Sequence, residues 1–160
     1  MKIKAIFISW DLILSVMIAV LFYLLLPNLI DIAFAKDLYG IGISVLSIVF
    51  SVYFAALAII ISSGDNEFVK FLEEDENLYS ELIFTFKFSL IILFIALIYS
   101  ILLYIQCSFK ISQNIKLQSS VFLVIFTFLF FYGLFASLNA TFDSIKYAKY
   151  RTKFLLLTKK

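Results

Sequence analysis

The sequence predicts an all-α membrane protein, and three observations support this fold class. Hydrophobic residues make up 64% of the chain and its mean hydropathy is +1.08, which excludes a water-soluble core with a polar surface. Four apolar windows are each long enough to cross about 30 Å of hydrocarbon. Proline occurs once, and the apolar runs lack the strict alternation of β-barrel strands. We therefore expect a polytopic bundle of four transmembrane helices.

The four predicted spans cover residues 10–31, 40–62, 84–106 and 119–141. The first span has two possible registers. Either it begins near Ala5 and buries Asp11, or Trp10 marks the inner interface and Asp11 caps a helix that continues past Pro27. We favour the second register, in which Pro27 kinks the outer end of the helix. A cleaved secretory signal ending at residues 33–35 is the alternative, but the apolar run is longer than a signal core.

Charge predicts the orientation of the chain in its membrane. An even number of crossings puts both termini on one side, and ten of the 13 Lys and Arg residues lie on that side. The positive-inside rule assigns that side to the cytoplasm. We therefore expect one four-helix domain with an acidic cytoplasmic loop over residues 63–83 and a basic cytoplasmic tail over residues 143–160.

Small residues form a stripe along the second predicted span. At 100° per residue they share an arc of about 80°. Small side chains allow close backbone approach in lipid, so we interpret the stripe as a helix-packing face of a homo-oligomer or of the chain itself. Its serines could instead line a water-filled path, although serines in spans usually bond to the carbonyl four residues back. This stripe comprises Gly40, Ser44, Ser47, Ser51, Ala55, Ala58 and Ser62, and the fourth span has a shorter stripe of Gly133, Ser137 and Ala140.

Three polar residues lie at the inner ends of the predicted spans: Asp11, Lys87 and Asn139. Polar groups at membrane depth are costly and often functional. We predict that Asp11 and Lys87 pair at the inner rim with Asn139 nearby. The alternative is that Lys87 extends to the lipid headgroups while Asp11 lies in water.

The acidic loop carries seven carboxylates and one lysine, Lys70. A helix capped by Ser63 or Asp65 places the apolar residues of the loop on one face and must end near residues 75–77. We predict a docking site for a cytoplasmic protein; a solvated connector is the alternative, and a calcium loop lacks the required spacing. The predicted docking residues are Phe68, Phe71, Leu72, Glu73, Glu74, Asp75 and Glu76.

The basic tail predicts an amphipathic helix that continues the fourth span. Its cations attract anionic lipid by about 1 kcal/mol each, so the lipid bilayer is the expected partner. Nucleic-acid contact through the interleaved tyrosines and cations is the alternative, and we expect no direct nucleic-acid binding. The residues predicted to face lipid headgroups are Lys146, Lys149, Arg151 and Lys153.

The residue types exclude most catalytic schemes. The chain has no His and one Cys, and it contains no glycine-rich phosphate loop and no paired carboxylates within a span. We therefore predict no enzyme, no metal site and no cofactor, and an unpaired thiol at Cys107. A small ion or drug transporter is a further alternative, for which Asp11 is the one carboxylate at span depth.

A four-span chain with cytoplasmic ends, small-residue stripes and a charged cytoplasmic loop resembles the membrane subunits of bacterial anti-phage defence systems. Examples are the four-span component of Kiwa and the membrane effectors of CBASS. The resemblance is one of architecture over the whole chain. It implies an oligomeric effector or sensor that perturbs or monitors the inner membrane when a cytoplasmic partner engages the acidic loop. A passive anchor that recruits a soluble partner is the alternative.

Overall fold

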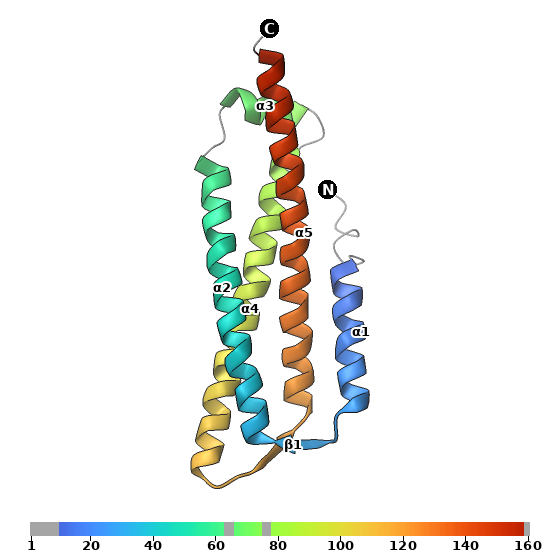
Figure 1. Cartoon of the computed structure of the whole chain (residues 1–160), viewed down its shortest axis with the longest axis vertical. Coiled ribbons are helices and arrows are strands. Elements are labelled where there is room, and N and C mark those ends of the chain that lie inside the picture. The colour runs from blue at the N-terminus through green and yellow to red at the C-terminus, as the bar shows by residue number, and fades with distance from the viewer. Residues whose placement is uncertain (1–9, 63–65, 75–77, 159–160) are drawn as a thin grey trace.

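The computed structural model describes residues 10–62, 66–74 and 78–158. Over these ranges the chain forms a helical bundle with a small two-stranded sheet at one end (Figure 1). We name the two ends of this bundle the strand end and the α3 end. The all-helical class predicted from the composition is confirmed. The elements are α1 (Trp10–Leu25), β1 (Leu29–Asp31), α2 (Ile32–Ser62), α3 (Asn66–Glu74), α4 (Leu78–Ser112), β2 (Leu117–Ser119) and α5 (Val121–Thr158).

Three helices, α2, α4 and α5, are long and apolar enough to cross a membrane. They contain 31, 35 and 38 residues, which at 1.5 Å per residue gives lengths of roughly 46 to 57 Å. These lengths exceed the roughly 30 Å thickness of a hydrocarbon core. Helix α1 is also apolar but has 16 residues, a length of roughly 24 Å. The three long helices indicate a membrane protein, while a fourth span and the orientation stay predictions.

The first predicted span is interrupted by its proline. Helix α1 ends at Leu25, the Leu26 N–H still donates to the Phe22 carbonyl at 2.9 Å, and strand β1 begins two residues after Pro27. The prediction that this helix continues past Pro27 with a kink is therefore wrong. Proline has no N–H to continue the helical hydrogen bonds, and its ring disfavours helical geometry at the residue before it.

A polar network joins the elements at the strand end. Strands β1 and β2 pair antiparallel with Ile30 opposite Gln118. The buried Gln118 amide donates to the Tyr39 hydroxyl at 3.2 Å, and the Cys107 thiol lies 3.2 Å from the Gln118 side-chain oxygen. Cys107 is a free, buried cysteine, as predicted. Helix α2 begins directly after β1, where Oδ1 of Asp31 accepts hydrogen bonds from two backbone N–H groups of its first turn.

Helix α5 lies between α1 and the pair formed by α2 and α4 (Figure 1). Its small residues Gly133, Ser137 and Ala140 are all buried. A Cβ added at Gly133 would lie 3.1 Å from the Leu93 side chain and 3.8 Å from that of Leu46. Glycine therefore allows α4 and α2 to approach α5 at one level of the bundle, and the short α5 stripe packs within the chain.

The close approach of α2 to α5 occurs at Gly42, which is outside the stripe predicted in the second span (the α2 stripe). A Cβ added at Gly42 would lie 2.5 Å from the ring of Phe126, which is buried and packs edge-on against Tyr39 with 5.0 Å between ring centroids. A Cβ at Gly40, two residues earlier, would meet the Tyr104 ring at an ordinary distance of 3.5 Å. The two glycines therefore form a matched pair for testing the packing.

We expect Gly42→Ala to lower the free energy of unfolding by roughly 1–3 kcal/mol, because the buried Phe126 ring has to move. Gly40→Ala should leave it unchanged or raise it by up to about 1 kcal/mol, because alanine favours a helix interior more than glycine and its Cβ meets no clash here. Reversible unfolding of both variants in mixed detergent micelles measures the difference. Equal stability of the two variants would contradict this packing of α2 on α5.

Candidate functional site

An aromatic cluster fixes helix α3 onto the far part of α5. The cluster comprises Phe68 and Phe71 of α3 and Tyr147 and Phe154 of α5, with ring centroids 5.3 to 5.4 Å apart between the two helices. Phe68 is 2% exposed and Leu72, one turn further along α3, is 1% exposed. The apolar face of α3 is thus buried within the chain.

The spacing of the apolar residues explains why these two helices meet. Phe68, Phe71 and Leu72 follow one another at steps of three and one, so they share a face of α3. Tyr147 and Phe154 are seven residues apart and share a face of α5. Each helix is amphipathic here, and each covers the apolar face of the other. The charged residues Glu67 and Lys70 of α3 remain exposed.

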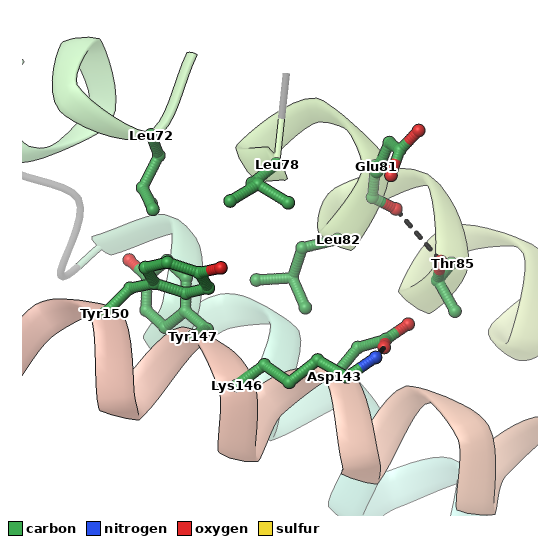
Figure 2. A pocket seen from close by; sticks show the side chains of 9 residues that line it. All are labelled: Leu72, Leu78, Glu81, Leu82, Thr85, Asp143, Lys146, Tyr147 and Tyr150. Atoms are coloured by element: carbon green, nitrogen blue, oxygen red, sulfur yellow. Dashed lines mark hydrogen bonds and ion pairs between the residues drawn. The ribbon is translucent and has the colours of Figure 1, made fainter. Parts of the chain in front are cut away.

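A pocket of about 160 Å³ lies beside this cluster, where α3, α4 and α5 meet (Figure 2). One end is apolar, with Leu72 and Leu78 facing the rings of Tyr147 and Tyr150 in Figure 2. The other end is polar. The full lining consists of Leu72, Leu78, Glu81, Leu82, Thr85, Asp143, Lys146, Tyr147 and Tyr150.

The polar end of the pocket contains one ion pair. The Lys146 ammonium donates to Oδ1 of Asp143 at 2.9 Å, and the two side chains are 70% and 35% exposed. An exposed pair one helical turn apart contributes only about 0.2–1 kcal/mol, so Lys146 can leave Asp143 at little cost. Glu81 adds a second carboxylate at the exposed rim. Among the lining residues that the structure describes, the two carboxylates and one ammonium group therefore give a net charge of −1.

The hydroxyl of Tyr147 has no hydrogen-bond partner although its oxygen is buried. Tyr147 is 9% exposed. A buried polar group without a partner costs about 1–3 kcal/mol, so a group that hydrogen-bonds to this hydroxyl would be favoured. Tyr147 belongs to the aromatic cluster through its ring contact with Phe68, and it also lines the pocket.

The predicted docking residues have different positions in the structure. Phe68 and Leu72 are buried and Phe71 is partly buried against α5, so these three side chains are not an open surface. Glu73 and Glu74 are the last residues of α3, with side chains outside the described part, and Asp75 and Glu76 lie outside the described residues. The helix end expected near residues 75–77 agrees with the end of α3 at Glu74 and the start of α4 at Leu78.

The basic tail continues α5 without a break to Thr158. Its predicted lipid-facing cations are all exposed, while its aromatic face packs on α3. The amphipathic pattern predicted that the aromatic face of the tail contacts a membrane surface. In the structure, Tyr147 and Phe154 pack instead on α3 of the same chain. The exposed cations are Lys146, Lys149, Arg151 and Lys153.

Most of the α2 stripe faces outward. Ser44, Ser51, Ala55, Ala58 and Ser62 are exposed, whereas Gly40 and Ser47 are partly buried. Three of its serines donate to the carbonyl four residues earlier, at 2.6 to 3.1 Å, and Ser62 donates to the carbonyl three residues earlier, at 3.1 Å. The stripe does not pack on the α5 stripe, and its hydroxyls are already bonded within their own helix.

The predicted inner-rim cluster does not assemble. Asp11 is 7% exposed at the start of α1, and its Oδ1 is buried without a partner. Lys87 and Asn139 are exposed, and neither a hydrogen bond nor an ion pair joins Asp11 to Lys87. The pair was predicted from shared depth along the helix axes, but depth does not determine which way a side chain points around its helix. Asp11 lies on the α1 face, with Ser15 and Ala19, that packs toward α5.

Sequence reasoning missed the pocket because its residues come from three helices. The helical spacing of the lining residues could have indicated the pocket. At the beginning of α4, Leu78, Leu82 and Thr85 follow one another at steps of four and three, so they share one face of the helix. Asp143, Lys146 and Tyr150 recur at steps of three and four on α5. Neither repeat stands out, because residues 78–83 and 143–150 were assigned to a cytoplasmic loop and a basic tail that were not expected to pack on each other within one chain.

Comparisons with protein-family models, with characterised proteins and with solved structures find no match for this chain. The function is therefore inferred from the residues and their geometry.

We expect Phe68→Ala to release α3 from α5, because a buried aromatic ring contributes several kcal/mol to packing. Amide hydrogen exchange of residues 66–74 in the intact chain should then accelerate by at least about 10-fold, which corresponds to 1.4 kcal/mol of local stability. Lys70→Ala, an exposed change on the same helix, is the control. If both variants exchange as the parent does, the aromatic cluster does not hold α3.

Proposed function

We propose that this chain is a membrane effector or sensor that responds to a cytoplasmic protein at its α3 end. Partner binding displaces α3 from the aromatic cluster, and the displacement reaches the membrane through α5. Copies of the chain that associate along the α2 stripe then perturb or report the state of the inner membrane. The link to anti-phage defence rests on the resemblance of architecture.

One observation carries this proposal: the apolar face of α3 is buried against a continuation of a spanning helix. Phe68 touches Tyr147 and Phe154, and both belong to the helix that also contains Gly133 in the packed centre of the bundle. A helix transmits displacement along its axis because its backbone is hydrogen-bonded throughout. The contact therefore connects the α3 end, where a partner would bind, with the longest helix of the chain.

The exposed α2 stripe supports the assembly step. Five of its seven residues are exposed, and small residues on a lipid-facing surface permit close contact with a second helix. The serine hydroxyls are bonded to their own backbone, which favours helix packing over a path lined by free hydroxyls.

A passive membrane anchor is the second candidate, and the same buried α3 favours it if α3 never leaves α5. The two functions differ in the effect of releasing α3. We expect Phe68→Ala to imitate partner binding and to depolarise cells that express it, as measured with a potential-sensitive dye. Lys70→Ala should leave the membrane potential at the level of the parent chain.

Assembly through the stripe predicts a second result in the same assay. Adding Ser47→Leu and Ser51→Leu to Phe68→Ala should restore the potential, because bulky side chains prevent close approach of the helices. Membrane fractionation must show equal insertion of all variants. Full insertion with an unchanged potential in every variant would contradict the effector function and support the passive anchor.

A further inference from the structure

We propose that the pocket between α3, α4 and α5 receives one cationic side chain, an arginine or a lysine, of the partner protein. This inference rests on the proposed function, since it names the chemistry by which a cytoplasmic partner is recognised at the α3 end. Of the nine described lining residues, Leu72 belongs to α3 and the other eight to α4 and α5, so the site persists when the partner displaces α3. Four properties of the pocket support it: volume, charge, apolar walls and an unpartnered hydroxyl.

The volume fits a single side chain. At about 160 Å³, the pocket is smaller than the roughly 300–1,000 Å³ of sites for drug-sized ligands. An apolar cavity of about 150 Å³ accommodates a benzene molecule, whose size lies between those of the lysine and arginine side chains. The occupant is therefore a group of this size rather than a whole cofactor or lipid headgroup with its tails.

The charge of the lining favours a cation. Glu81 and Asp143 supply two carboxylates and Lys146 one ammonium group. The exposed Lys146 forms an ion pair with Asp143, which lies one helical turn away on α5. Exposed ion pairs of this kind contribute little free energy. An incoming cation can therefore replace Lys146 at Asp143 while Lys146 turns into solvent. The adjoining acidic segment, with Glu67 exposed on α3, attracts a basic partner over a longer range.

The apolar end of the pocket suits the methylene groups of such a side chain. Leu78 and Leu82 face the rings of Tyr147 and Tyr150 across the pocket (Figure 2). Arginine and lysine bury their methylene groups against apolar surface, and their charged ends are attracted to the faces of aromatic rings. The planar guanidinium of arginine stacks on tyrosine better than an ammonium does, so arginine is the better fit.

The hydroxyl of Tyr147 provides a hydrogen-bond acceptor that the chain itself does not satisfy. Its oxygen is buried and without a partner, whereas guanidinium and ammonium groups are donors only. In Figure 2 this hydroxyl lies toward Leu72 and away from Lys146 and Asp143, so an N–H donor of the partner that reaches the apolar end would remove the cost of this unsatisfied group. An anion would instead meet two carboxylates.

The experiment uses the full chain in nanodiscs of neutral phosphatidylcholine and the peptide acetyl-Gly-Arg-Gly-amide. Tyrosine ring signals are followed by NMR during titration. The same peptide with citrulline, the neutral isostere of arginine, is the control for shape. We expect saturable shifts of the Tyr147 and Tyr150 signals with the arginine peptide and none with the citrulline peptide.

Three variants test the assigned residues, and a fourth, Glu67→Gln, is the control. Glu81→Gln should weaken peptide binding by about two- to five-fold, the range expected for one exposed charge pair. Lys146→Gln should tighten binding by a similar factor, because the competing cation is gone. Glu67→Gln removes the same charge from α3 outside the pocket and should change the affinity by less than two-fold. Tyr147→Phe keeps the ring and should weaken binding by removing the hydroxyl alone.

Three results would overturn the inference: equal binding of the citrulline peptide, weaker binding by Lys146→Gln, or equal losses in Glu67→Gln and Glu81→Gln. The last result would indicate diffuse attraction to the acidic surface. The membrane-potential assay uses no peptide, so a chain that depolarises on release of α3 but ignores the arginine peptide refutes this inference and leaves the proposed function standing.

Discussion

The contact between α3 and the far part of α5 is the interaction on which the α3 end of this protein depends. Two short amphipathic surfaces meet there through four aromatic rings, and each would otherwise expose its apolar face. Their packing also positions the pocket, since Leu72 and Tyr147 belong to both. A segment that the charge pattern alone presents as a loop is thus part of the folded core.

The two ends of the bundle are built differently. At the strand end, β1 pairs with β2, and a buried Gln118 bonds to Tyr39 and contacts Cys107, which ties the elements together through satisfied polar groups. At the α3 end, the pocket has an exposed rim, a weak ion pair and an unpartnered hydroxyl. A ligand gains the most binding free energy from polar groups that are unsatisfied or weakly paired in the free protein. We therefore place the recognition of a partner protein at the α3 end.

Much of the fold could be predicted because membrane helices follow from length and hydropathy. The three long helices, the short helix with Phe68 and Leu72 on one face, and its end before residue 78 agree with the structure. The end of α1 at Leu25 was missed because a proline near a helix end can kink or terminate it, and the sequence does not decide between them. The strands were missed because three residues are too few to show alternation.

The candidate site was less predictable because it depends on rotation about helix axes. The small residues of the α2 stripe were predicted to form a packing face, yet within the chain α2 packs through a different face, which includes Tyr39, Gly42 and Leu46, and most of the stripe is exposed. Asp11 and Lys87 share a predicted depth but do not meet. Bulky aromatic residues decided which faces pack, and their effect depends on neighbours that come from other helices.

The account is tested most directly by the distance between α3 and α5 in a bilayer. Spin labels at Glu67 and Lys149, both exposed, would report this distance by pulsed electron paramagnetic resonance of the full chain in nanodiscs. We predict one narrow distance distribution, which becomes broad when Phe68→Ala is added. A broad distribution in the otherwise unaltered chain would contradict the packing of α3 on α5, and with it the proposed route from a cytoplasmic partner to the membrane.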